Sequence, residues 1–88
     1  MAHAMANIRQ ETRRILDHAL GLNGRALAFA EDTALLGALP ELDSMAVVAV
    51  LTALEERFGF VIHDDEIDGS VFATVGSLAA FVEHKTGP

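Results

Sequence analysis

The sequence contains no cysteine, few basic residues and no long apolar run. Without cysteine the chain forms neither a disulfide framework nor a thiolate metal site, so any thiol in its chemistry has to come from another molecule. No stretch of 18 apolar residues occurs, which argues against a membrane-spanning helix. The segment from Met1 to Met5 lacks the basic start and apolar core of a signal peptide. We therefore expect a cytoplasmic protein without membrane insertion.

Basic residues are especially scarce in the later part of the chain. The 88 residues include 13 acidic and 6 basic side chains, for a net charge of −7. Residues 31–88 hold eleven of the acidic side chains and only two of the basic ones. Such a field repels nucleic acid and steers encounters with proteins that present arginine and lysine. We expect basic protein partners and no nucleic acid, with acidic residues kept for solubility as the alternative.

Apolar residues at helical spacing predict an all-α fold in one domain, residues 7–86. Residues 1–6 are expected to be a disordered N-terminal segment or a cloning remnant. Helices are predicted over 7–20 with Asn7 as its cap, over 44–58, and from a Thr74 cap onward, with a short helix around Ile67 capped by Asp64. A connection of about twenty residues joins the first two helices and needs apolar anchors. The candidate anchors are Leu27, Phe29, Leu35, Leu36 and Leu39.

The helix over 44–58 is apolar on two sides. One side carries residues at core spacing, namely Val47, Val50, Leu51, Leu54 and Phe58. The opposite side carries Met45, Val48, Ala49 and Thr52 where a solvent-facing surface would be polar. Either the long connection covers this second side or partner proteins dock on it, and we favour docking.

Asp43-Ser44-Met45 stands where the loop containing Pro40 gives way to this helix. The first amide groups of a helix have no partners inside it and can seat a phosphate. Ser44 lacks a Gly-x-Ser-x-Gly elbow, and no histidine occurs in its helix or the preceding loop. Ser44 is therefore interpreted as an attachment point rather than a nucleophile.

At these residues the chain resembles the acyl carrier proteins, whose Asp-Ser-Leu or Asp-Ser-Met motif opens the second helix. The resemblance extends over residues 5–85 and includes the helix end Leu54 to Gly59, the turn Ile62 to Glu66, and Thr74-Val75. It implies a four-helix bundle with a long loop between helices one and two and a short helix three. It also implies a monomeric, non-catalytic carrier that holds acyl groups as thioesters on 4′-phosphopantetheine attached to Ser44.

The partners implied by this resemblance are a phosphopantetheinyl transferase and acyl-activating ligase, acyltransferase or synthase enzymes. Many carriers of fatty acid synthesis place acidic residues early in the second helix, where this chain has Ala46 and Ala49. Recognition would then depend on the carboxylates Asp43, Glu55, Glu56 and Glu41 and on apolar contact. These features are similar to dedicated carriers of polyketide or exopolysaccharide-associated systems.

Three alternatives stay open at the level of sequence. A peptidyl carrier is disfavoured because Glu41-Leu42 stands where such carriers commonly have Gly-Gly. An acidic helical adaptor without the arm and a small hydrolase using Ser44 are the others. Ser44→Ala is expected to abolish loading and to cost at most about 1 kcal/mol as a lost cap.

The remaining motifs indicate no metal site. Asp64 to Gly69 begins like a calcium loop, but Phe72 and Val75 would stand at its ninth and twelfth positions, so two ligands are missing. A groove between the second helix and the short third helix could shelter a short acyl chain, although we interpret most of its residues as core. Its candidates are Val47, Leu51, Ile62 and Ile67.

Overall fold

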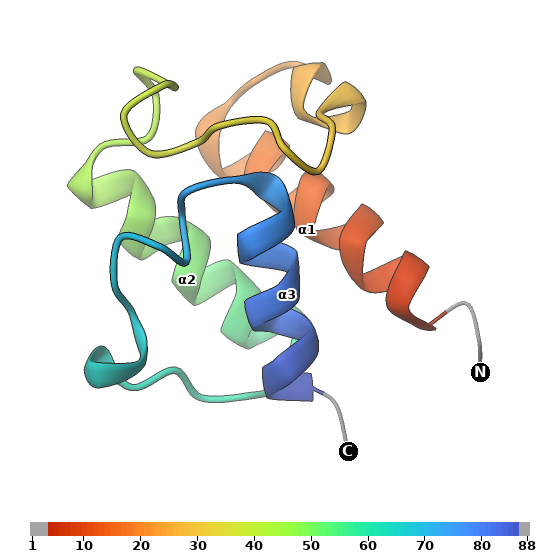
Figure 1. The fold of residues 1–88 in the computed structure, drawn as a ribbon, viewed down its shortest axis with the longest axis vertical. Coiled ribbons are helices and arrows are strands. Elements are labelled where there is room, and N and C mark those ends of the chain that lie inside the picture. Colours follow the sequence, from red (N-terminus) through yellow and green to blue (C-terminus); the bar gives the residue numbers. More distant parts are fainter. Residues whose placement is uncertain (1–3, 87–88) are drawn as a thin grey trace.

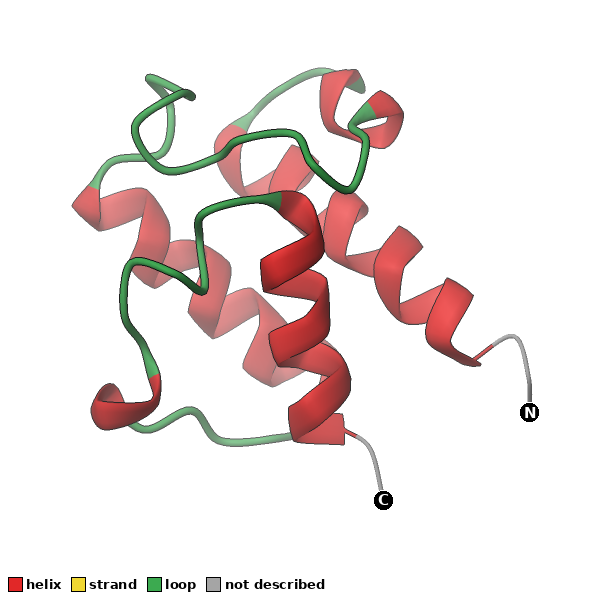
Figure 2. Cartoon of the chain, viewed as in Figure 1, coloured by secondary structure: helices red, strands yellow, loops and turns green. Residues whose placement is uncertain are grey.

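A computed structural model describes residues 4–86. In chain order its elements are α1 (Ala4–Leu20), the 3₁₀ turn η1 (Arg25–Ala28), α2 (Ser44–Phe58), the 3₁₀ turn η2 (Asp64–Glu66) and α3 (Val75–Thr86). α1 packs against both α2 and α3, and the long connection lies over one end of the helices (Figures 1 and 2). The described residues form no strand, and their extended pairing is limited to an isolated bridge between Ala34 and Thr74. The predicted all-helical class is confirmed.

The helix α1 packs through the side that the sequence indicated. Thr12 and Leu16 are fully buried, and the Thr12 hydroxyl donates to the Ile8 carbonyl at 2.7 Å, which satisfies its buried oxygen. Ile8, Ile15 and Ala19 pack against the core. The helix begins at Ala4 instead of Asn7, so Asn7 lies inside the first turns and is not the N-cap residue. Residues 1–3 lie outside the described part of the chain.

Only part of the predicted set of apolar residues anchors the long connection. Leu35 is fully buried, and Phe29 and Leu39 pack against the core as expected. Leu27 and Leu36 are wrong as anchors because nearly half of each side chain is exposed. Leu22 and Ala26 are buried in their place. Ala26 and Leu27 are neighbours in the η1 turn, which turns Ala26 inward and Leu27 outward.

The predicted four-helix bundle is wrong in its helix count, because the described residues contain three α-helices and the short η2 turn stands in place of the predicted third helix. The Glu66 bond has the spacing of a helix-start cap, whereas the Asp68 bond after the turn competes with continuation of the helix. Glu66 Oε1 accepts from the His63 amide at 2.8 Å, and Asp68 Oδ1 accepts from the Ser70 amide at 2.9 Å. The turn therefore ends at Glu66, before Ile67. The predicted cap by the Asp64 side chain falls outside the described side chains.

The start of α3 is a reciprocal cap built from Thr74 and Ser77. Thr74 Oγ1 accepts from the Ser77 amide and Ser77 Oγ accepts from the Thr74 amide, both at 3.0 Å. Thr74 therefore acts as the predicted cap. The residues predicted to face the core are all fully buried, namely Val75, Leu78, Ala79 and Val82.

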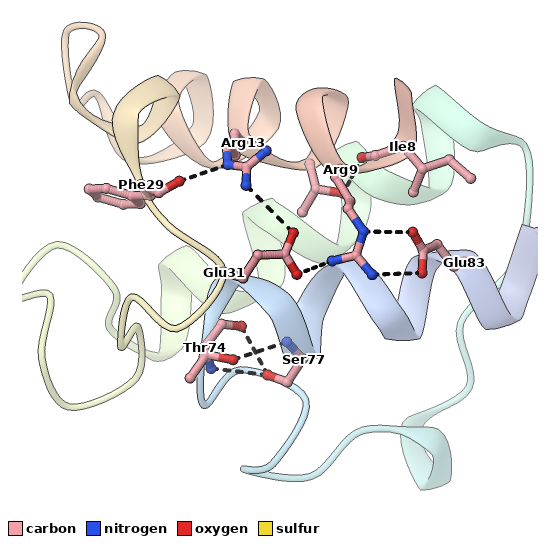
Figure 3. A network of polar contacts seen from close by, with 9 residues as sticks. Ile8, Arg9, Arg13, Phe29, Glu31, Thr74, Ser77 and Glu83 are labelled. Carbon is pink, nitrogen blue, oxygen red and sulfur yellow. Dashed lines mark hydrogen bonds and ion pairs between the residues drawn. The ribbon is translucent and has the colours of Figure 1, made fainter. Parts of the chain in front are cut away.

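Polar contacts tie the long connection to α1 and α3 (Figure 3). Arg9 in α1 pairs with Glu31 of the connection and, through its Nε at 3.1 Å, with Glu83 Oε2 of α3. Arg13 Nε donates to the Phe29 carbonyl at 2.9 Å. The sequence analysis did not identify this network, which fixes the loop that leads into α2.

Candidate functional site

Ser44 is the first residue of α2, and its side chain is exposed to solvent. Asp43 is the N-cap residue, because its Oδ1 accepts from the Ala46 amide at 2.8 Å. The Asp43 carbonyl accepts from the Val47 amide at 2.9 Å, as in a regular first turn. The cap is therefore Asp43 and not Ser44, which corrects the cap assigned to Ser44 from sequence. The preference for aspartate at this position was the available signal.

α2 contains no histidine that could act as a base for Ser44. His18 lies in α1, His84 lies in α3, and His63 lies in the segment after α2. The Ser44 side chain is exposed to solvent, and it stands next to helix amides that have no partners within α2. This arrangement fits a phosphodiester on Ser44, since a helix N-terminus stabilises an anion by about 0.3 to 1 kcal/mol.

The side of α2 next to Ser44 is an exposed apolar surface. Met45 is 79% exposed and Val48 is 61% exposed, and Ala49 and Thr52 are exposed as well. We call these four residues the α2 face. The long connection leaves the α2 face open, so the first of the two sequence interpretations is wrong.

The opposite side of α2 packs into the molecule as predicted. Val50 and Leu54 are fully buried. Val47, Leu51 and Phe58 are partly buried and pack against the core. Gly59 ends the helix in the left-handed conformation with φ of 75°, which glycine adopts without the steric cost of a Cβ. One side of α2 therefore forms part of the core, and the α2 face is exposed to solvent.

Several carboxylates near the site already hold intramolecular bonds. Glu41 accepts from the Arg25 guanidinium at 2.7 Å, and this hydrogen bond lowers the pKa of Glu41 below its ordinary value. Asp43 caps α2, and Glu55 Oε2 accepts from the Ile62 amide at 2.7 Å. Glu56 is exposed on α2. Three of these carboxylates, those of Glu41, Asp43 and Glu55, thus contribute hydrogen bonds that stabilise the fold.

A cavity of about 320 Å³ opens beside α2. Its lining residues are Val48, Leu51, Thr52, Glu55, Ile62 and Ile67. Leu51, Ile62 and Ile67 belong to the groove considered from sequence, whereas Val47 packs toward the core. The interpretation of most groove residues as core is therefore wrong for Ile62 and Ile67. Sequence reasoning missed Val48, Thr52 and Glu55, although their helical spacing places them on one side of α2.

The acidic turn around η2 is an ion-paired segment. Lys85 Nζ of α3 contacts both carboxylate oxygens of Glu66 at 2.9 Å. The His63 amide and Lys85 hold the pKa of Glu66 below its ordinary value. Within residues 4–86, no group of three or more histidine or carboxylate side chains is placed to hold a metal ion. Over the same residues, no helix is long and apolar enough to cross a membrane.

Comparison with known proteins identifies the family. Residues 10–82 match the model of the phosphopantetheine attachment site family, and the chain belongs to this family. The chain is also similar to a holo acyl carrier protein from Nitrosomonas europaea whose solution NMR structure is known. The two are 49% identical with a TM-score of 0.85, and the match covers 100% of both chains. A search of curated proteins gave no significant match.

The fold and these comparisons define an acyl carrier. The protein carries acyl groups and uses a 4′-phosphopantetheine prosthetic group. Membership of the family implies interaction with transferases and with biosynthetic enzymes in general.

Proposed function

We propose that Ser44 is the residue to which the 4′-phosphopantetheine arm is attached. The observation that carries this proposal is the exposed hydroxyl at the first residue of α2, directly after the capping Asp43. Ser44 is a substrate here, and the chain itself does no catalysis. A phosphopantetheinyl transferase would supply the base and Mg²⁺ that activate the hydroxyl toward coenzyme A. The arm's distal thiol holds acyl groups as thioesters, and its tether raises their effective concentration at a docked enzyme.

The α2 face is the proposed docking surface for these enzymes. It lies next to Ser44 and exposes Met45 and Val48, which are large apolar side chains. Ala46 and Ala49 leave the first two turns of α2 without carboxylates. This supports recognition mainly by apolar contact, and hence a dedicated carrier of the polyketide or exopolysaccharide-associated type. Its partners would include an acyl-activating ligase, acyltransferase or synthase.

The cavity beside α2 is the proposed shelter for the acyl chain. Its wall is formed on one side by α2 and on the other by Ile62 and Ile67 of the segment before α3. Residues 7–86 would form the single carrier domain, acting as a monomer in the cytoplasm. The acidic later part of the chain supports partners that present basic residues around their docking sites.

Loading with the arm tests the assignment of Ser44. The purified apo protein would be incubated with coenzyme A and a broad-specificity transferase, and its intact mass measured. We expect the wild type and a Ser70→Ala control to gain one phosphopantetheine, and Ser44→Ala to gain none. Ser70 is a suitable control because it is an exposed serine outside α2. Loading of Ser44→Ala would place the attachment site elsewhere, and a wild type that gains no mass would support an adaptor.

A further inference from the structure

The cavity beside α2 combines an apolar wall with two hydrogen-bonding side chains. Four of its lining residues are aliphatic, and the other two are Thr52 and Glu55. Thr52 and Glu55 are three residues apart on α2, so their side chains are neighbours on one side of the helix. The cavity thus presents a hydroxyl and a carboxylate next to each other.

Glu55 retains hydrogen-bonding capacity toward the cavity. Its Oε2 accepts from the Ile62 amide at 2.7 Å, which fixes the carboxylate against the cavity wall. An ionised carboxylate has about four lone-pair sites, and the Ile62 amide occupies one of them. Glu55 is half-buried, so water reaches its remaining sites through the cavity. Thr52 is exposed and can donate or accept through its hydroxyl.

A hydroxyl and a carboxylate in the wall would affect different classes of acyl chain differently. A saturated chain that enters the cavity would remove water from Glu55 and Thr52 without replacing the lost hydrogen bonds, which is unfavourable. A chain with a hydroxyl group would bury the same apolar surface and replace a lost water by a bond to the carboxylate. A charged amino group would also bond to Glu55, but it would lose its hydration beside four aliphatic side chains.

We infer that this cavity selects medium-length acyl chains that carry a hydroxyl group over saturated chains of the same length. The inference rests on the proposed function of the cavity as the acyl shelter. The volume supports the length, because about 320 Å³ is roughly twice the cavity of about 150 Å³ that holds benzene. By this comparison the space admits up to about twelve carbon atoms, so an eight-carbon chain fits within it. Thr52 and Glu55 are the specificity-determining residues.

The test compares carriers loaded with three chains, octanoyl, 3-hydroxyoctanoyl and 8-hydroxyoctanoyl, on the intact protein. The fraction of sheltered chain would be measured from the amide NMR shifts of Ile62 and Ile67 relative to the unacylated holo protein. We expect at least one hydroxylated chain to be sheltered about 5- to 10-fold more than octanoyl, as one replaced hydrogen bond would give. The Ile62 amide should shift most because it donates to Glu55.

Two variants assign the effect to the cavity wall. Thr52→Val keeps the shape of the side chain without its hydroxyl, and Glu55→Gln keeps an acceptor for the Ile62 amide without the charge. Each should reduce the preference for the hydroxylated chain several-fold, while Thr86→Val at the end of α3 should leave it unchanged. Unchanged preference in both cavity variants would overturn the assignment to Thr52 and Glu55.

The outcomes separate this inference from the proposed function. Equal shifts at Ile62 and Ile67 for all three chains would leave the cavity as an acyl shelter and overturn the selection. An absence of shifts with every chain, on protein shown by mass to be acylated, would overturn both the shelter and the selection. Failure to acquire the arm at Ser44 would be seen by mass before any chain is tested.

Discussion

Asp43 and Ser44 are neighbours in the chain with different tasks. Asp43 faces the helix and satisfies the Ala46 amide, whereas Ser44 faces solvent. Because aspartate performs the capping, the serine hydroxyl is free of a structural role at the helix start. Modification of Ser44 by another enzyme would therefore leave the first turn of α2 undisturbed.

This division predicts different stability costs for the two residues. Asp43→Ala should lower the free energy of unfolding by about 1 kcal/mol, because the Ala46 amide loses its acceptor. Ser44→Ala should change the same quantity by less than about 0.5 kcal/mol. Urea denaturation followed by circular dichroism would measure both, with Asp43→Asn as the control that retains a capping oxygen. A larger loss in Ser44→Ala than in Asp43→Ala would contradict the assignment of the cap.

At the scale of elements, the position of the long connection depends on its close approach to the start of α3. The Gly76 amide donates to the Glu31 carbonyl at 2.7 Å, and the Val75 amide donates to the Thr33 carbonyl at 3.0 Å. Arg9 then holds Glu31 from α1 (Figure 3). The connection is fixed at its middle, which in turn positions the start of α2 and Ser44.

Gly76 is required for this approach. A Cβ added at Gly76 would lie 2.9 Å from the Glu31 carbonyl oxygen, which is backbone and cannot rotate away. Alanine in place of a helical glycine ordinarily stabilises a helix by about 1 kcal/mol. Gly76→Ala should instead destabilise this protein by about 1 to 3 kcal/mol, because the connection has to move.

Thermal or urea unfolding would measure the Gly76→Ala effect. Ala80→Gly is the matched comparison, since Ala80 is exposed in the same helix and reports helix propensity alone. It should cost about 0.5 to 1 kcal/mol. A more stable Gly76→Ala protein would show that the contact with Glu31 is dispensable.

At the scale of the whole molecule, the proposed docking assigns the acidic charge and the exposed apolar residues to different stages of the encounter with a partner. The net charge of −7 acts at long range and attracts basic surfaces. The α2 face, the proposed docking surface, would act at contact, where Met45 and Val48 are exposed beside Ser44. Met45 and Val48 are not part of the core, because both side chains are exposed.

The α2 face predicts a binding defect without a stability defect. Met45→Ala should raise the KM of a phosphopantetheinyl transferase for the carrier about 5-fold, with kcat unchanged, because an apolar contact is lost before and during the reaction. The unfolding free energy should stay within about 0.5 kcal/mol of wild type. Leu27→Ala is the control, since Leu27 is also an exposed large apolar residue but belongs to η1. Equal KM values for the wild type and Met45→Ala would remove Met45 from the docking surface.

The sequence by itself determined the helical class, the core sides of α1, α2 and α3, and the exposed start of α2. These features follow from local spacing and capping, which act within one or two turns of a helix. The family resemblance identified from Asp43, Ser44 and the later turns was confirmed by the comparisons. The attachment at Ser44 stays a prediction.

Only the tertiary structure decided the features that depend on residues far apart in the chain. It replaced the predicted third helix by η2, whose Glu66 pairs with Lys85 of α3. It also chose Leu22 and Ala26 over Leu27 and Leu36 as anchors, and it formed a cavity wall from Thr52 and Glu55. Such outcomes depend on packing and ion pairs between separate elements, and local periodicity carries no information about which element a side chain will meet.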